Sequence, residues 1–437
     1  MPNNLPLNWC ECKLGDVFKT SSGGTPSRKE TSYYGGDIPW LKSGELNDGI
    51  ISEAEEFITK EGLENSSAKI FPKGSILLAL YGATVGKIGI LDFDSATNQA
   101  VCCIYSNPYF DKNLLFYYLL SQRKHLINQG KGGAQPNISQ DIVKNLVLPL
   151  PPMAEQERIV EKIEALFADI DEGVENLKTA QAQIKQYRQS VLKSAFEGKL
   201  YKTTEWKETQ LKNIIDSSQI GVVRSTGEQS TQKVGIPYVK MNNITLDGMF
   251  NINNIVYVQA SSDEIKKYSL KNGDILFNTR NSYELVGKNA IVYNINKPMI
   301  YNNNLMRIRT KSQIDSKFLV YQMNSTKFKN CIKRVKKATT NICALYSKDI
   351  FPILINIPTL LEQQRIVEEI EKRFTVADEL EKTINDGLEK AKQLKQSILK
   401  KAFSGQLVPQ DPNDEPASIL LDRIKKEKQS QTKGKKR

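Results

Sequence analysis

Histidine is almost missing from this chain of 437 residues, which contains only His125. The six cysteines are dispersed and never form a C-x-x-C pair; they are Cys10, Cys12, Cys102, Cys103, Cys331 and Cys343. Zinc sites and disulfide frameworks need closer or more regular spacings, so we expect no metal site and reduced, mostly buried cysteines. His125 lies in "SQRKHLINQ" and is expected on a helix surface rather than as a catalytic base.

Long apolar runs are also absent. The strongest one, residues 76–80, is far shorter than the ~20 residues that span a bilayer. The beginning, "MPNNLPLNWC", lacks the basic and then apolar pattern of a signal peptide. With 39% hydrophobic and 25% charged residues, the composition is ordinary for a soluble globular protein. Together with the dispersed cysteines, it leads us to expect a cytosolic protein with no membrane partner.

No catalytic motif emerges from the sequence. "GATVGKI" at 82–88 is one residue too short for a phosphate-binding loop and has no Ser or Thr after its lysine. No G-x-G-x-x-G opens a cofactor-binding fold. We therefore expect a binding protein with no catalytic residues and no cofactor of its own. A self-contained enzyme remains an alternative, because carboxylate clusters of the nuclease type cannot be recognised by eye.

Positive charge is concentrated in one block. The net charge is +12, and residues 206–357 alone hold 22 basic and 10 acidic side chains. Residues 1–150 hold 14 basic and 15 acidic side chains. A basic globular block suggests nucleic acid, although a solvated surface would look the same by charge alone.

A helix opening is written twice, as "AEQERIVEKIEALF" from 154 and "LEQQRIVEEIEKRF" from 361. A shift of 207 aligns residues 154–200 with 361–407 without a gap, and the far ends match again as "QSVLKSAFEGKL" and "QSILKKAFSGQL". Apolar residues recur every three or four positions, which predicts one long helix per copy, ended by Gly198 and Gly405. About 44 residues would form a rod of roughly 65 Å.

The apolar stripe of each helix needs a partner, and the nearest candidate is the other copy. We expect an antiparallel coiled coil, because a globular block joins the end of the first helix to the start of the second. Two independent helices docked on separate domains are the alternative. Gly173 and Gly387 are expected to mark a kink or a close approach.

The repeat extends to the blocks before the helices, with "DIPWLKSGELNDGI" matching "GIPYVKMNNITLDGM". These blocks are rich in short strands, with helices near 111–124 and 315–330. The fold class is therefore mixed α/β, with an internal pseudo-twofold repeat. The expected ranges are a first domain at 1–150, a first helix at 151–200, a second domain at 201–357, a second helix at 358–407, and a segment at 408–437 with a basic, disordered tail.

This pattern resembles the specificity subunits of type I restriction-modification systems over essentially the full length. The two "EQ-RIVE-IE" helices and the phrases "GGTPSR", "IPWLKSGEL", "GATVGK" and "GGAQPNISQDI" carry the resemblance. It implies two target recognition domains that read the halves of an asymmetric, bipartite site on double-stranded DNA. It also implies that two methyltransferase subunits dock on the helix pair and that a translocating restriction subunit joins them.

On the same resemblance, S-adenosylmethionine, ATP and magnesium are expected on the partner subunits, in a prokaryotic cytoplasm with the nucleoid. "NPY" at 107–109 lacks the second proline of the methyltransferase motif, which agrees with a subunit that binds while its partners react. A structural coiled-coil adaptor without DNA specificity is a further alternative.

Candidate DNA contacts are the cations, hydroxyls, Asn and Gln of the recognition loops, since these groups bind phosphates and base edges. In the first domain they are Thr25, Ser27, Arg28, Lys42, Tyr81, Thr84, Lys87, Lys131, Gln135 and Asn137. In the second they are Arg224, Lys240, Asn242, Asn243, Arg280, Asn281, Lys288, Lys333, Arg334, Lys336 and Lys337. The last four lie in 327–337, which holds six basic and no acidic side chains. Here the sequence departs from the family phrase, since "GGAQPNIS" is replaced by "KKATTNICALYS".

Overall fold

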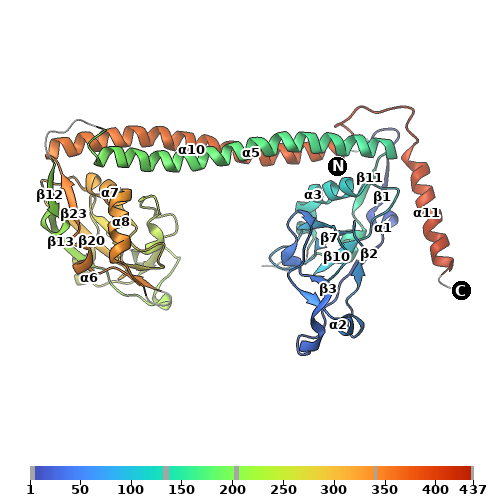
Figure 1. Ribbon diagram of the computed structural model, residues 1–437, viewed down its shortest axis with the longest axis horizontal. Coiled ribbons are helices and arrows are strands. Elements are labelled where there is room, and N and C mark those ends of the chain that lie inside the picture. Colours follow the sequence, from blue (N-terminus) through green and yellow to red (C-terminus); the bar gives the residue numbers. More distant parts are fainter. Residues whose placement is uncertain (1–4, 131–136, 201–205, 339–341, 435–437) are drawn as a thin grey trace. The chain divides into compact units, whose positions relative to one another are not determined.

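The chain forms two compact units in a computed structural model that describes residues 5–130, 137–200, 206–338 and 342–434 (Figure 1). The first unit comprises Met1–Asn176 and Gly387–Arg437, and the second comprises Leu177–Asp386. Each unit contains one α/β domain and part of both long helices. We call the domains the first domain, residues 5–150, and the second domain, residues 206–357.

The first domain is built on two sheets and one long helix. The larger sheet has the order β2 (Thr20–Ser22), β10 (Val101–Ile104), β7 (Ile76–Ala79), β8 (Ile88–Leu91), β4 (Gly49–Ile51). The smaller has the order β5 (Phe57–Ile58), β3 (Tyr34–Leu41), β9 (Ser95–Thr97), β6 (Ile70–Phe71). Helices are α1 (Leu14–Val17), α2 (Lys60–Glu64), α3 (Lys112–Gln129) and α4 (Gln140–Lys144). All four residues of β7 are buried, which explains the apolar run seen in the sequence.

The second domain repeats this plan, with its strands divided among three sheets. Its four-stranded sheet has the order β13 (Ile215–Ile220), β20 (Leu305–Thr310), β16 (Ile275–Asn278), β18 (Asn289–Ile291). A three-stranded sheet has the order β15 (Val256–Val258), β14 (Ile236–Val239), β19 (Ile300–Tyr301). A second three-stranded sheet has the order β17 (Arg280–Asn281), β22 (Cys343–Ala344), β21 (Lys337–Ala338). Helices are α6 (Ser262–Tyr268), α7 (Ser316–Asn324), α8 (Thr326–Val335) and α9 (Ser347–Ile350). The helix expected at 315–330 is broken at Ser325, whose hydroxyl accepts from the Phe328 amide and so starts α8.

A two-stranded antiparallel ribbon brings the ends of each domain together. In the first domain β1 (Cys10–Lys13) pairs with β11 (Val147–Leu150), and in the second β12 (Lys207–Gln210) pairs with β23 (Leu354–Ile357). The chain leaves β11 and β23 directly into α5 (Met153–Phe196) and α10 (Leu360–Ala402). The predicted long helices are confirmed, and each begins where its domain ends.

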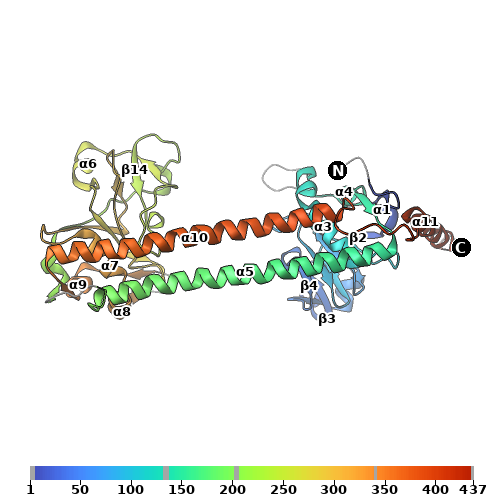
Figure 2. The same cartoon turned by 90° about the horizontal axis from the view of Figure 1, so that it is seen from above.

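The two long helices run antiparallel within each unit, as Figures 1 and 2 show. In the first unit Lys395, near the end of α10, pairs with Asp171 in the first half of α5 at 2.6 Å. In the second unit Gln181, in the second half of α5, donates to Asn385 of α10 at 3.4 Å. The predicted antiparallel helix pair is confirmed. No atom lies within 4 Å of a Cβ built on Gly173, so the close approach expected there is not found.

The repeated "EQ" of the helix opening fastens each domain to its helix. Gln156 is fully buried; its carbonyl accepts from the Asp111 amide at 2.8 Å, and its amide donates to the Pro151 carbonyl at 3.2 Å. Gln363 is equally buried and accepts from the Asp315 amide at 2.8 Å. Asp111 and Asp315 cap the domain helices α3 and α7. One glutamine therefore ties a domain helix to a long helix in both copies.

The glycines predicted to end the helices do so in a left-handed conformation. The φ of Gly198 is 69° and that of Gly405 is 70°, values that L side chains rarely adopt. Their amides donate to the carbonyls of Ala195 and Ala402, which would otherwise lack partners at the helix end. A side chain at Gly405 would also collide with Pro6, since a Cβ there lies 2.1 Å from the Pro6 Cγ.

The C-terminal segment differs from the disordered tail expected there. Residues Ala417–Gly434 form helix α11, which buries Leu420, Leu421 and Ile424 in the core of the first domain. Lys428 donates to the Gly15 carbonyl at 2.8 Å. The expectation rested on the lysines and overlooked the apolar stripe that ends directly before them, at Ile424. Within the described residues, no helix is both long and apolar enough to cross a membrane.

Candidate nucleic-acid interface

The basic run of the second domain forms the end of α8 and the strand that follows it. Helix α8 buries Phe328 and Ile332 and exposes Lys333 and Arg334. Both cations lie in the last turn of the helix, where the backbone carbonyls favour positive charge. Neither has an ion pair among the residues that the structure describes, which leaves both available to phosphate groups.

The next two lysines lie against exposed tyrosines. The Lys336 ammonium is 4.7 Å from the ring centroid of Tyr283, and the Lys337 ammonium is 6.0 Å from that of Tyr346. Burial lowers the pKa of Lys336. Lys337 also pairs with Asp349 at 3.1 Å. Exposed aromatic rings with cations beside them are typical of surfaces that bind sugar, base and phosphate together.

A small sheet brings a second predicted segment to the same place. Strand β22 pairs with β17 on one side and β21 on the other, so Ala344 lies opposite both Arg280 and Lys337. Asn281 donates to Asn278 at 3.0 Å, while the Arg280 side chain is exposed and has no partner in the described part of the chain. Arg280 therefore lies near the run that holds Lys333, Arg334 and Lys336, although the two segments are far apart in the sequence.

The remaining candidates of the second domain mostly support the loop 240–251. Lys288 donates to the carbonyls of Met241 at 2.9 Å and Ile244 at 2.7 Å, and burial lowers its pKa. Asn243 is buried and donates to the Asn251 carbonyl. Lys240 donates to Gln229 at 2.9 Å, and only Asn242 of this group is exposed. These contacts hold Asn242 in place without using its side chain.

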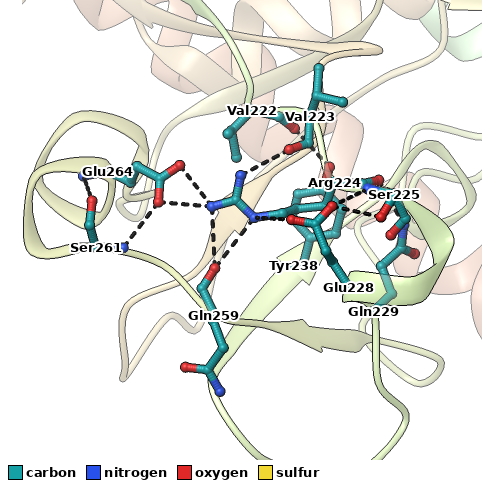
Figure 3. Close-up of polar contacts among 10 residues, drawn as sticks. All are labelled: Val222, Val223, Arg224, Ser225, Glu228, Gln229, Tyr238, Gln259, Ser261 and Glu264. Carbon is teal, nitrogen blue, oxygen red and sulfur yellow. Dashed lines mark hydrogen bonds and ion pairs between the residues drawn. The ribbon is translucent and has the colours of Figure 1, made fainter.

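Arg224 is the most restrained candidate (Figure 3). Its Nη2 donates to both carboxylate oxygens of Glu264 at 2.7 and 2.8 Å, and its Nη1 donates to the Val223 carbonyl at 2.9 Å. A further pair of bonds reaches the Gln259 carbonyl, and only 12% of the side chain is exposed. The hydrogen bond from Arg224 holds the pKa of Glu264 below its ordinary value. Contact with DNA would require this network to break.

Arg28 is the counterpart in the first domain, and its setting is more open. It forms two bonds to Glu56, yet 53% of its side chain is exposed. The guanidinium stacks at 4.3 Å over Tyr34 and at 5.0 Å over Trp40. Lys42 shares Glu56 at 3.4 Å. The carboxylate orients Arg28 while one face of this cluster remains open to a ligand.

The other candidates of the first domain divide between supporting and exposed positions. Thr84 donates to the Ser43 carbonyl at 2.8 Å, Thr25 donates to Gln99, and Tyr81 is half-buried, which raises its pKa. The exposed candidates are Ser27, Lys87 and Asn137. Lys131 and Gln135 lie outside the described residues. Which of these side chains contact DNA stays a prediction.

Sequence reasoning missed the tyrosines beside the basic run. Tyr283 and Tyr346 are 48% and 45% exposed, so both rings are accessible beside the cations. Their signal was present, because each lies within ten residues of a predicted cation and a basic patch with interleaved aromatics indicates nucleic acid. Among the described residues, no group of three His, Cys, Asp or Glu side chains is placed to hold a metal ion.

Comparison with known proteins agrees with this geometry. The family described as the type I restriction modification DNA specificity domain matches residues 6–179 and 203–390. The EcoKI specificity subunit of Escherichia coli K12 is 26% identical over 97% of this chain and 96% of its own length. The MjaVIII specificity subunit of Methanocaldococcus jannaschii is 27% identical over 90% of the chain and 92% of its own.

Solved structures show the same fold. A chain from a study of the assembly and conformational transition of the type I restriction-modification system has a TM-score of 0.70 at 22% identity and covers 93% of this chain and 100% of its own. The HsdS subunit of Thermoanaerobacter tengcongensis has a TM-score of 0.50 at 21% identity, over 93% and 99% of the two chains.

Proposed function

Because the chain belongs to the type I restriction-modification DNA specificity family, we propose that it reads a bipartite, asymmetric DNA site with one half-site per domain and brings partner subunits to that site. The observation that carries this proposal is the contrast between the two halves of each repeat. The contacts that fasten domain to helix are the same in both copies, while the exposed cations and aromatics of the two domains differ. Different surfaces on one frame suit two different half-sites.

Direct and backbone readout have separate candidates within this proposal. Lys333, Arg334 and Lys336 neutralise phosphates, a contact that fixes position without reading sequence. Arg280 and Asn242 are exposed and carry the planar donor groups that pair with guanine and adenine edges. In the first domain the stacked and oriented Arg28 takes the base-reading role.

The partners are two methyltransferase subunits on the helix pair, joined by restriction subunits. Exposed apolar side chains on the long helices support this part of the proposal. Val376 and Leu380 are about half exposed and lie two residues from Asp378, so 3.6 residues per turn places them on the opposite side of α10. Tyr187 of α5 is 44% exposed, and its repeat equivalent Leu394 is 53% exposed. Such residues on a charged helix indicate a protein partner.

The chemistry belongs to those partners. S-adenosylmethionine, ATP and magnesium bind the methyltransferase and restriction subunits, and the present chain supplies the DNA specificity. A self-contained enzyme would instead methylate or cleave DNA as the purified chain alone. A structural adaptor would leave the assembled complex without preference among duplexes.

Methylome sequencing of the host with and without this gene tests the proposal. We expect one bipartite methylated motif to disappear on deletion and to return when the gene is restored from a plasmid. Exchange of the second domain alone should change one half of the motif and leave the other half intact. Retention of every methylated motif after deletion would contradict the proposal.

A further inference from the structure

Each domain has a second attachment to the long helices, three turns beyond the buried glutamine. In the first unit Tyr117 of α3 packs edge-to-face on Phe167 of α5, with ring centroids 5.6 Å apart and planes at 80°. Lys395 of α10 lies over the same Phe167 ring at 4.7 Å and pairs with Asp171 at 2.6 Å. We call these four residues the first clamp. A domain, the helix that follows it and the opposite helix thus meet at one ring.

The second unit contains the equivalent set, the second clamp. Tyr321 of α7 packs on Phe374 of α10 with centroids 5.7 Å apart and planes at 89°. Arg188 of α5 lies over Phe374 at 5.1 Å and pairs with Asp378. Phe374, Asp378 and Lys395 are the positions that the 207-residue shift assigns to Phe167, Asp171 and Arg188. The clamp is therefore part of the repeat, although its tyrosine lies in a divergent domain.

The two clamps differ in strength. Arg188 also contacts Glu381 at 3.3 Å, and only 18% of its side chain is exposed. Lys395 has one carboxylate, and Val174 stands at the position equivalent to Glu381. Arginine can satisfy two carboxylates with its planar fork, whereas a lysine ammonium acts as a point charge. The two long helices are therefore held together more firmly at the second clamp than at the first.

The two attachments on one helix have different mechanical roles. Gln363 and Phe374 are 11 residues apart, as are Gln156 and Phe167, which is ~16 Å along a helix. Apolar side chains between them, such as Phe318 of α7 with Ile366 and Ile370 of α10, also join the second domain to its helix. The clamp is the contact that lies ~16 Å beyond the glutamine, so its loss leaves the domain held on one side and changes the angle between domain and helix.

Open space beside the second clamp gives it more control over that angle. A pocket of about 400 Å³ lies between the second domain and the helices, and Arg188, Tyr321, Phe374 and Asp378 line it. Because side chains do not fill this volume, the clamp is not backed there by continuous core packing. Loss of the Phe374 ring would let the domain tilt into the pocket without meeting other atoms.

We infer that Phe167 and Phe374, with the tyrosine and cation on either side of each, are positioning residues that fix the angle of the recognition domains and so determine which spacer length between the half-sites is accepted. The inference rests on the proposed function. It adds residues that contact no DNA to those that decide DNA specificity.

The test is spacer discrimination by the complete complex with its methyltransferase subunits. Duplexes carry the motif found by methylome sequencing, with the spacer native or one base pair longer, and the ratio of their dissociation constants is measured. For Phe374→Ala we expect this ratio to fall roughly fivefold, the factor that ~1 kcal/mol of aromatic contact supplies. Tyr321→Phe keeps the ring and should keep the ratio.

A variant that weakens the helix pair elsewhere is the control. Ile384 of α10 is buried ten residues beyond Phe374, and Ile384→Ala should lower stability while leaving the ratio unchanged. An unchanged ratio in Phe374→Ala, or an equal fall in Ile384→Ala, would overturn the inference while leaving the methylated motif and the proposed function in place. A wild-type complex with no bipartite motif would instead refute the proposed function.

The difference between the clamps provides a gain-of-function test. Val174→Glu with Lys395→Arg gives the first clamp the two-carboxylate arrangement of the second. We expect sharper spacer discrimination, by roughly two- to fivefold, the range of one added ion pair. Discrimination that stays the same or becomes weaker would contradict the role assigned to the cation.

Discussion

Replacement of Gln363 by leucine should destabilise the second unit severely. Its side chain is fully buried and makes three hydrogen bonds, accepting from the Asp315 amide and donating to the carbonyls of Gln313 at 3.2 Å and Pro358 at 3.0 Å. Leucine has nearly the same size, so the main loss is polar. Each group left unpaired in the interior costs about 1–3 kcal/mol. Allowing for relaxation, we expect a loss of about 3–5 kcal/mol.

Urea denaturation followed by tryptophan fluorescence measures this loss. Trp206 packs in the cluster around Phe318 in the second unit, whereas Trp9 and Trp40 lie in the first. A variant that keeps Trp206 alone therefore reports on the second unit, in which Gln363 lies. The matched control is Gln181→Leu, a glutamine on the other long helix with one exposed bond of 3.4 Å, where we expect a change within about 0.5 kcal/mol. Equal effects of the two substitutions would refute the buried-glutamine reasoning.

Three further predictions follow from the surface contacts. Lys336→Ala should weaken binding of every duplex and reduce the salt dependence of binding by about one ion, measured by titrating affinity against salt; an unchanged slope would remove Lys336 from the interface. Tyr187→Asp should reduce copurification of the methyltransferase subunit without altering the stability in urea. Full copurification would exclude Tyr187 from the contact with that subunit. The hydrogen bond from Arg224 holds the pKa of Glu264 below its ordinary value, so their pair stabilises the fold at neutral pH and that stability is lost in acid, as the pH falls through the lowered pKa. Glu264→Gln should therefore flatten the stability profile in acid, and parallel profiles would count against it.

The long helices were predictable because their evidence is local. The repeated opening, the apolar period and the closing glycine locate α5 and α10 within a few residues of their observed ends. The failure at α11 is of the same kind, since Leu420, Leu421 and Ile424 form a recognisable stripe that the neighbouring lysines outweighed. The local pattern predicts α11 as well when the apolar positions are weighed before the charges.

The candidate site was less predictable, because the fate of a cation depends on residues far away in sequence. Arg28 and Arg224 look alike in the sequence, each following a glycine-bearing loop. The structure gives Arg224 a carboxylate 40 residues away and encloses it, and gives Arg28 one 28 residues away and leaves it half exposed. Ion pairs between residues so far apart in the chain cannot be inferred from the spacing of residues in the sequence. Composition could therefore nominate cations for the interface but could not tell which are already occupied.

The comparison of Arg28 with Arg224 also explains how two domains of the same fold can recognise two different half-sites. Trp40 donates from its indole to the Gly24 carbonyl at 2.9 Å, and Tyr238 donates from its hydroxyl to the Val222 carbonyl at 2.7 Å. Two different aromatics thus fasten the same stretch of loop, four residues before Arg28 in one domain and two before Arg224 in the other. Any aromatic ring with a hydrogen-bond donor at its far end can hold this loop in place, so the loop residues beyond it are free to change. Specificity can therefore diverge at the loop while the glutamines and clamps that position each domain remain fixed.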